Sequence, residues 1–460
     1  MQPLTKAYFE NRGDTEDSGP NRSELRLARG WCLNLISLRS RYGQSVALTL
    51  AFFLLLGGVG AGQSATLITL DQAIDLGLAH NHTLRAERTL IKQNQAQEIT
   101  ANLRPNPTLV GDAQFIPIFQ PDNFSSDYLN ESQQFDLGLG YLFERGGKRQ
   151  RRLQAAKDQT AVTVSQVTDA ERTLAFNVGQ QFVDVLLAES TLQFAEQDLK
   201  SFQQTVDVGE AQYKAGAISE GDYLKIKLQL LQFQTDVSSA RLARVQALVS
   251  LRELLGYDAV PANFDVIGDL AYQPLQASVE DLQAKALNLR PDLRAAQLGV
   301  TAAQSQILLA QANGKQDITG TGDYTHVGGV SSASLFFSMP LPIFNRNQGE
   351  IARTRFALTQ AQETQQLASD TVLGDVSNAY EGLKSNDEVV QLYVAGYLKQ
   401  AQDSRDISEY AYRRGAATLL DFLDAERSYR AIQLAYRQAL ASYMTALEQL
   451  KTAVGTRNLP

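Results

Sequence analysis

The chain has 460 residues and a formal net charge of −8, with three histidines and one cysteine. The mildly acidic balance argues against a nucleic-acid partner, and the scarcity of His and Cys argues against a dedicated metal site or thiol chemistry. The sequence contains no nucleophile–base set, phosphate loop or cofactor motif, so we expect no enzyme and no cofactor.

Residues 1–65 show the order of features that is typical of a secretory signal peptide. A polar flank with several arginines precedes an apolar run from Val46 to Gly60, and small residues follow it. The run is short for a transmembrane helix, and a single membrane anchor is the alternative interpretation. The cysteine, Cys32, lies in this leader, so a processed chain without cysteine suits an oxidising compartment.

The rest of the chain consists of one unit that occurs twice, as in an internally duplicated protein. The first repeat covers residues 66–257 and the second covers residues 278–455. An inter-repeat, equatorial segment at 258–277 joins them, and a C-terminal tail follows at 456–460. Both repeats begin with a helical pattern, and the residue pairs that coincide between them are Leu78/Leu287, Leu84/Leu293, Arg85/Arg294 and Ala86/Ala295.

Each repeat continues with two predicted β-strands, at about 107–117 and 132–143 in the first and about 316–328 and 333–343 in the second. Apolar side chains alternate with small or polar ones, which is typical of transmembrane strands around an aqueous lumen. A soluble sheet with one wet face is the alternative. The two apolar faces are Phe135, Leu137, Leu139, Tyr141 and Phe143, and Leu335, Phe337, Met339, Leu341 and Ile343.

A long helical hairpin follows the strands in each repeat. A helix of about 65 residues, or roughly 100 Å, runs to a turn, and a return helix covers about 218–255 or 417–454. Proline is absent from 122–260 and from 343–459, as such long helices require. Apolar residues in the last helix are spaced by three and four, so we expect these helices to pack against neighbouring copies of the chain.

The two hairpin turns share one sequence pattern. Tyr213, Gly216 and Asp222 in the first turn correspond to Tyr412, Gly415 and Asp421 in the second. The glycines are predicted to end the helices in a left-handed conformation. Capping of the return helix is one interpretation of the aspartates, and packing within the turn is one interpretation of the tyrosines.

Four strands from one chain cannot close a membrane barrel, because closed barrels have at least eight and an open edge is not tolerated in lipid. Three copies would supply twelve strands, with the helical hairpins forming a continuous tube. The expected fold class is therefore mainly α with a β-barrel portion. It consists of internally duplicated coiled-coil hairpins and four transmembrane strands per protomer, closed as a 12-stranded barrel and helical tunnel in a trimer.

The second turn and the helix after it, Tyr412–Glu426, resemble the TolC family of outer membrane efflux proteins. The resemblance covers about 66–455, and the segments Leu341–Ile351 and Arg145–Arg149 resemble the heavy-metal (CzcC-type) branch. It implies a homotrimer in the cell outer membrane of a Gram-negative-type bacterium, in contact with membrane lipid and extending into the periplasm. It also implies a periplasmic adaptor (membrane fusion) protein and an inner-membrane pump of the RND type as partners.

The function that this resemblance implies is a passive exit duct in a tripartite efflux system, with heavy-metal cations as a candidate substrate. A type I secretion exit channel and a general drug efflux channel are alternatives on the same fold. A periplasmic coiled-coil adaptor is the alternative from a different class. An adaptor would carry one hairpin and a flanking β-rich domain, whereas this chain has two matching hairpins.

The resemblance also assigns roles to residues at the turns. Asp421 and Asp424 match carboxylates that ring the narrow periplasmic end of the pore, where three copies of each would attract cations and repel anions. Tyr412 and Asp222 match partners that latch neighbouring hairpins in the closed state, and the complete latch and turn set is Tyr213, Gly216, Asp222, Tyr412 and Gly415.

One position of the latch departs from the family pattern. A member of the TolC family carries an arginine two residues after the second turn glycine, whereas this chain has Ala417 there. The neighbouring Arg413 and Arg414 are the candidate substitutes.

Overall fold

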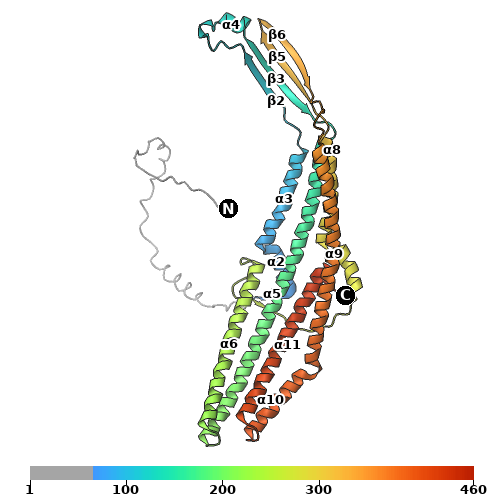
Figure 1. Cartoon of the computed structure of the whole chain (residues 1–460). Helices are drawn as coiled ribbons and strands as arrows, with labels where there is room; N and C mark the ends of the chain where they lie inside the picture. Colours follow the sequence, from blue (N-terminus) through green and yellow to red (C-terminus); the bar gives the residue numbers. More distant parts are fainter. Residues whose placement is uncertain (1–65, 460) are drawn as a thin grey trace, which may run out of the picture. The chain divides into compact units, whose positions relative to one another are not determined.

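The computed structural model describes residues 66–459, and the predicted signal peptide at 1–65 lies outside them. The first repeat contains α2 (Leu70–His80), α3 (His82–Asn102), β2 (Thr108–Gln114), β3 (Gln134–Phe143), α5 (Lys148–Lys214) and α6 (Glu220–Leu255). The second contains α7 (Val279–Leu289), α8 (Pro291–Asn313), β5 (Ile318–Val327), β6 (Val330–Ser338), α9 (Gln348–Leu392), α10 (Leu398–Arg413) and α11 (Leu419–Val454). Both repeats thus have the predicted order of an opening helical region, two strands and a long helical hairpin, and the opening region consists of two helices (Figure 1).

Short elements complete the fold. The two-residue strand β1 (Leu67–Ile68) pairs in parallel with β4 (Asp265–Val266), which ties the start of the first repeat to the inter-repeat segment. A 3₁₀ turn, η1 (Pro121–Asn123), and the helix α4 (Ser126–Glu131) lie in the connection between β2 and β3. The sequence pattern did not predict these short elements.

Side-chain caps explain where several helices begin. An N-cap hydroxyl accepts a hydrogen bond from the amide three residues later, which satisfies one of the free donors of the first helical turn. Thr69, Ser219, Ser278 and Thr418 cap α2, α6, α7 and α11 in this way. Corresponding helices therefore begin at corresponding places in the two repeats.

The four longer strands form one antiparallel sheet in the order β2-β3-β5-β6. Side chains alternate along β3 as predicted, because Leu137 and Leu139 are exposed while Gly138 and Gly140 are covered. A Cβ atom at Gly138 would collide with the Asp323 side chain and lie 2.9 Å from the Gly322 carbonyl oxygen on β5, so this position favours glycine. None of the helices in residues 66–459 has the length and apolar character that a membrane span needs.

The predicted end of the last strand is wrong. Strand β6 ends at Ser338, whereas the sequence pattern placed Met339, Leu341 and Ile343 on its apolar face. Pro340 and Pro342 follow the strand, and proline has no amide hydrogen for a ladder bond. The apolar alternation therefore continues past the point where the backbone can still pair.

The two long hairpins differ in continuity. Helix α5 is unbroken over 67 residues, as predicted. The corresponding helix of the second repeat is interrupted by a π-helical segment at Tyr393–Tyr397, where Gly396 has non-helical angles (φ 156°, ψ −21°). Figure 1 shows the chain changing direction between α9 and α10 at this point. The prediction of one continuous helix in the second repeat is therefore wrong, because glycine permits a backbone conformation that a helix interior lacks.

Each repeat has its own apolar core. The first core packs α2 and the start of α3 against α5 and the end of α6, and its fully buried members include Val178, Val185, Leu251 and Leu255. The second core packs α7 against α9 and α11, and its fully buried members include Val372, Val376, Leu450 and Val454. These cores fix the opening helices against the hairpins in both repeats.

Candidate functional site: the two hairpin turns

The long hairpins reverse direction by the same backbone turn. Gly216 and Gly415 have φ angles of 74° and 72°, in the left-handed region that glycine tolerates best. The amide after each glycine donates to the carbonyl five residues before it, at 2.8 Å from Ala217 and 2.9 Å from Ala416. This arrangement is a Schellman motif, and it confirms the predicted left-handed helix ends.

A hydroxyl and a carboxylate then start each return helix. The Asp421 amide donates to Thr418 Oγ1 at 3.2 Å, while the Thr418 amide and hydroxyl donate to Asp421 Oδ2 at 3.1 and 2.7 Å. In the first turn, the Ser219 hydroxyl donates to Asp222 Oδ2 at 2.9 Å and Lys225 Nζ donates to Oδ1 at 3.2 Å. These donors lower the pKa of both aspartates, so both side chains carry a negative charge at neutral pH.

Two aromatic rings stack in each turn. Tyr213 lies parallel to Tyr223 with ring centroids 5.1 Å apart, and Tyr412 lies parallel to Phe422 at 5.5 Å. In each pair, one ring comes from the end of the long helix and the other from the first turn of the return helix. The repeated sequence pattern therefore encodes an aromatic clasp across each turn.

The two clasps are buried to different degrees. Tyr412 is 8% exposed, whereas Tyr213 is 38% exposed. The second turn buries its clasp because it packs against the first hairpin in an apolar cluster, which we call the inter-hairpin cluster. The members of this cluster are Phe202, Val206, Ile226 and Phe233 from the first hairpin, and Tyr412, Leu419 and Phe422 from the second.

A cavity of about 790 Å³ lies between the two turns. Asp222 and Lys225 line it from the first turn, and Tyr412, Arg413 and Arg414 line it from the second. The Tyr412 hydroxyl is buried and has no hydrogen-bond partner among residues 66–459. Burial raises the pKa of Tyr412, and the charge of Asp222 raises it further. The predicted latch partners therefore face one cavity within a single copy of the chain.

The two arginines beside Ala417 already have partners on α10. Arg413 forms an ion pair with Glu409, and Arg414 lies over the ring of Tyr410 with its guanidinium carbon 5.4 Å from the centroid. Both arginines nevertheless line the cavity between the turns. They bring positive charge to the cavity wall beside Ala417.

The two carboxylates assigned to the pore lie on the exposed side of α11. Asp421 is exposed, and the Asp424 side chain is 72% exposed with one oxygen 3.8 Å from Arg427. Asp421 combines the predicted capping role with an exposed charge, so the two interpretations of this residue do not exclude each other. Both charges are available to a neighbouring molecule or to the solvent.

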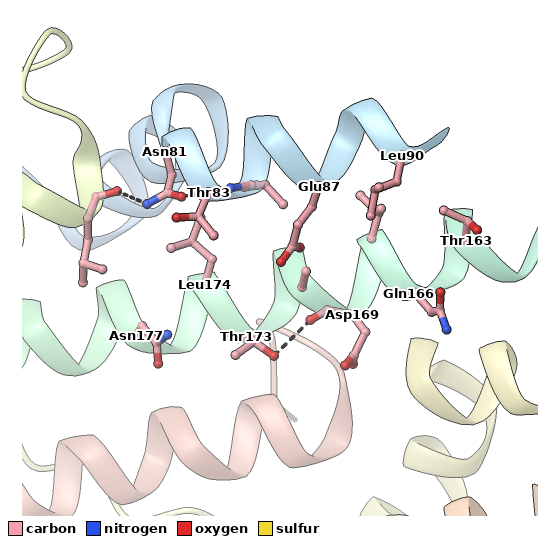
Figure 2. A pocket seen from close by; sticks show the side chains of 14 residues that line it. Asn81, Thr83, Glu87, Leu90, Thr163, Gln166, Asp169, Thr173, Leu174 and Asn177 are labelled. Atoms are coloured by element: carbon pink, nitrogen blue, oxygen red, sulfur yellow. Dashed lines mark hydrogen bonds between the residues drawn. The ribbon is translucent and has the colours of Figure 1, made fainter. Parts of the chain in front are cut away.

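A second hollow, of about 580 Å³, lies between α3 and α5 (Figure 2). Several of its polar side chains bond to the backbone. Asn81 donates to the Leu254 carbonyl at 3.0 Å, and the Thr173 hydroxyl donates to the Asp169 carbonyl at 3.1 Å. The first bond ties the start of α3 to the end of α6, and the second lies within α5. Within residues 66–459, no three His, Cys, Asp or Glu side chains are grouped so that they could hold a metal ion.

Comparison with known proteins decides the family. The family model described as "Outer membrane efflux protein" matches residues 73–257 and 282–456, which include both hairpins and the sheet. The chain belongs to the outer membrane efflux protein family. The two matched segments correspond to the two repeats, and members of this family are channels of the outer membrane.

Two curated relatives of this efflux protein extend over most of the chain. The cobalt-zinc-cadmium resistance protein CzcC of Cupriavidus metallidurans is 23% identical over 403 residues, which cover 85% of this chain and 91% of the relative. The pyoverdine export outer membrane protein OpmQ of Pseudomonas putida is 24% identical over 406 residues, which cover 82% and 85%. The predicted resemblance to this family and its heavy-metal branch is therefore confirmed.

A solved structure agrees with the fold. The open state of the MtrE outer membrane channel of Neisseria gonorrhoeae has a TM-score of 0.69 and 21% identity, with 84% of this chain and 89% of that chain covered. The predicted fold class and the location in the outer membrane are confirmed, and the alternative of a periplasmic adaptor is wrong.

Four further residues contribute to the turns and were not among the predicted site residues. Tyr223 and Phe422 complete the two clasps, and both stand directly after an aspartate of the repeated pattern. The shared aromatic character at this position was the available signal. The hydroxyls of Ser219 and Thr418 could also have been predicted, because each lies three residues before the same aspartate.

Proposed function

We propose that this efflux protein is the exit duct of a tripartite system and works as a homotrimer. A periplasmic adaptor protein connects it to an inner-membrane pump of the RND type, which supplies the energy. The duct itself is passive and catalyses no reaction. The observation that carries this proposal is the four-stranded sheet, whose outer strands β2 and β6 each have one unpaired edge within the described residues.

The sheet needs further strands to be stable in lipid. Apolar side chains such as Leu137, Leu335 and Phe337 are exposed on it, which suits contact with acyl chains. Open edges in hydrocarbon leave backbone donors and acceptors without partners, which costs several kcal/mol for each unsatisfied group. Identical edges from two further copies would close a barrel of twelve strands.

The helices carry a matching signal for self-association. On α6, exposed apolar residues follow one another in steps of three and four, with one longer gap, namely Leu224, Leu228, Leu231, Leu242, Val245 and Val249. On α9 and α10, exposed apolar residues include Leu392, Ile407 and Tyr410. Apolar stripes of this kind are buried by a partner helix in coiled coils. We propose that the partner helix belongs to a second copy of the chain.

At the periplasmic end, we propose that Asp421 and Asp424 form the ring that selects charge. Three copies would place six carboxylates around a narrow opening, and the low pKa of Asp421 keeps that residue ionised. The turn segments 213–224 and 412–424 would contact the adaptor. The latch and turn residues Tyr213, Gly216, Asp222, Tyr412 and Gly415 would hold the hairpins together in the closed state.

Heavy-metal cations are the proposed cargo. The relative CzcC is named for resistance to cobalt, zinc and cadmium, and a further relative, CusC of Escherichia coli, is named a cation efflux system protein. A ring of carboxylates suits cations. Export of a siderophore is the second candidate, because the relative OpmQ is named for pyoverdine export. None of these names refers to protein secretion, so we favour efflux over a type I secretion exit.

The experiment is a measurement of ion selectivity in planar bilayers. Asp421→Asn combined with Asp424→Asn removes the charges, while the amide that replaces the Asp421 carboxylate keeps an oxygen that accepts from Thr418. We expect the reversal potential in a salt gradient to move toward zero. Asp403→Asn, which changes an exposed carboxylate on α10, should leave it unchanged. An unaltered reversal potential in the double variant would refute the ring.

A further inference from the structure

Next to the inter-hairpin cluster, charged side chains from four helices meet in a buried position. We infer that Asp198 on α5 and Glu426 on α11 share one proton, and that this carboxyl pair makes the packing of the second hairpin on the first depend on pH. The inference rests on the proposed function, because it concerns the hairpin that carries the proposed charge ring.

The pair is well buried. The Asp198 side chain is 2% exposed and the Glu426 side chain is 9% exposed, and the two carboxyl groups lie within hydrogen-bonding reach of each other. Two ionised carboxylates repel at this distance, whereas one carboxylic acid can donate to one carboxylate. The geometry therefore favours a single proton on the pair.

The neighbouring arginines do not neutralise both carboxyl groups. Arg430 Nε lies 2.6 Å from Asp198 Oδ2, and the same guanidinium also pairs with Asp236 on α6. Arg405 lies 3.9 Å from Glu426 but 2.9 Å from Asp406, so its nearer partner is elsewhere. Asp198 on α5, Arg405 on α10, and Tyr429 and Arg430 on α11 act on Glu426 directly. The two arginines also pair with Asp236 on α6 and with Asp406 and Glu409 on α10, which complete the set of charged groups around the pair. Carboxylates outnumber guanidiniums in this set.

Aromatic rings lie against the two arginines beside the buried pair. The guanidinium of Arg430 lies 4.1 Å from the ring centroid of Phe233, and that of Arg405 lies 4.8 Å from the ring of Tyr429. Phe233 in turn stacks on Phe202 at 4.3 Å. In such an environment a second negative charge is poorly solvated, which favours the neutral form of one carboxyl group.

The direction of the pH effect follows from these contacts. Burial and the neighbouring Asp198 raise the pKa of Glu426 to about 7 from its ordinary value of 4.5, against the opposing effect of Arg405. Burial also raises the pKa of Asp198. A carboxyl group whose pKa is raised in the packed state stabilises that state fully below pH 4.5 and no longer does so above pH 7. The two hairpins should therefore pack most firmly in acid.

Loss of the proton would weaken the packing of the second hairpin on the first. Glu426 lies on α11, the same helix as the ring residues Asp421 and Asp424. Arg405 lies on α10, beyond the π-helical break at Gly396. Above neutral pH, repulsion between Asp198 and Glu426 favours separation of α10 and α11 from α5 and α6, with the break at Gly396 as the place where the backbone can bend.

The test measures the separation of the hairpins directly. Spin labels are placed at Ala215→Cys and Ala416→Cys, two exposed turn positions, in a Cys32→Ser background of the full chain. Labelled copies are diluted with unlabelled ones, so that each assembly carries one labelled chain. We expect a narrow distance distribution at about pH 5, below the raised pKa of Glu426, and a longer, broader one at about pH 8, above it.

Three variants decide the cause. Glu426→Gln has the shape of the protonated acid and should keep the narrow distribution at both pH values, so the response to pH is lost. Asp403→Asn removes an exposed carboxylate from α10 and should behave as the unmodified protein does. Asp198→Asn also leaves a single carboxyl group and should likewise lose the response to pH, so it replaces Glu426→Gln if that variant does not assemble.

Two results would overturn the inference. One is a distance distribution in the unmodified protein that does not change between the acid and the alkaline sample. The other is a full pH response in both Glu426→Gln and Asp198→Asn. The measurement requires no ion flow, so a failure of the charge ring to select cations would leave this result unaffected and would count only against the proposed function.

Discussion

The two hairpins begin from the same sequence pattern and reach different environments. Both turns have a left-handed glycine, a capping hydroxyl and a stacked aromatic pair. The first hairpin has an unbroken helix α5, and its Tyr213 is partly exposed. The second has a break at Gly396 and buries Tyr412 against the first. Local sequence thus determines the conformation of each turn. Packing between the two repeats of one chain determines the environment of each hairpin.

The largest expected effect comes from removal of the charge that joins the hairpins. Arg430→Ala leaves Asp198 and Asp236 without their shared cation, and Asp198 is almost fully buried. Breaking a buried ion pair typically costs about 3–5 kcal/mol. We expect the free energy of local unfolding of α10 and α11, measured by amide hydrogen exchange, to fall by about that amount. Exchange in α2, α3, α7 and α8 should change little.

The matched control for this variant is Arg241→Ala on the first hairpin. Arg241 pairs with Glu196, and both side chains are more than half exposed. Exposed pairs contribute at most about 1 kcal/mol, so exchange should stay close to that of the unmodified protein. Equal effects of the two arginine variants would contradict the view that the second hairpin is held by buried charge.

An intermediate effect should separate the two aromatic clasps. Phe422 is 2% exposed in the inter-hairpin cluster, so Phe422→Ala should cost about 3 kcal/mol in the local opening of α10 and α11. Tyr223 occupies the corresponding position of the first turn and is only partly buried, so Tyr223→Ala should cost about 1 kcal/mol. Hydrogen exchange measures both. Similar losses at the two positions would mean that the clasps are equivalent after all.

The smallest expected effect concerns the charge state of the second turn. The Thr418 hydroxyl and amide lower the pKa of Asp421 from its ordinary value of 3.8, so this carboxylate keeps its charge until the pH falls below that value. Thr418→Ala removes the hydroxyl and should raise the pH at which the channel loses its cation selectivity on acidification. Thr418→Ser keeps a hydroxyl and serves as the control. Identical titrations of selectivity for both variants would exclude a role of the cap in the charge of Asp421.

Much of this fold follows from local patterns, because helix length, strand alternation and turn glycines are encoded by neighbouring residues. The end of β6 and the break in the second long helix were not predicted correctly. Proline at 340 and 342 stops strand pairing while the apolar alternation continues, and Gly396 lies in a stretch that otherwise favours helix. In both places, one residue type overrides a longer favourable pattern.

The candidate site was predictable only in part. The turn residues share a pattern that repeats along the chain, so they could be found without a structure. The buried carboxyl pair could not, because Asp198 and Glu426 lie in different repeats and meet only when the second hairpin packs on the first. Neither residue belongs to the repeated turn pattern. Pairing across such a separation depends on tertiary packing, which periodicity along one helix does not report.

The claim that one copy holds too few strands to enclose a pore is tested most directly by comparing purified species of known mass. The protein in detergent is separated by size, the mass of each fraction is measured, and each fraction is added to a planar bilayer. We predict stepwise conductance from the fraction of three chains and none from single folded chains. Steady channels formed by a species that remains a monomer would contradict the account.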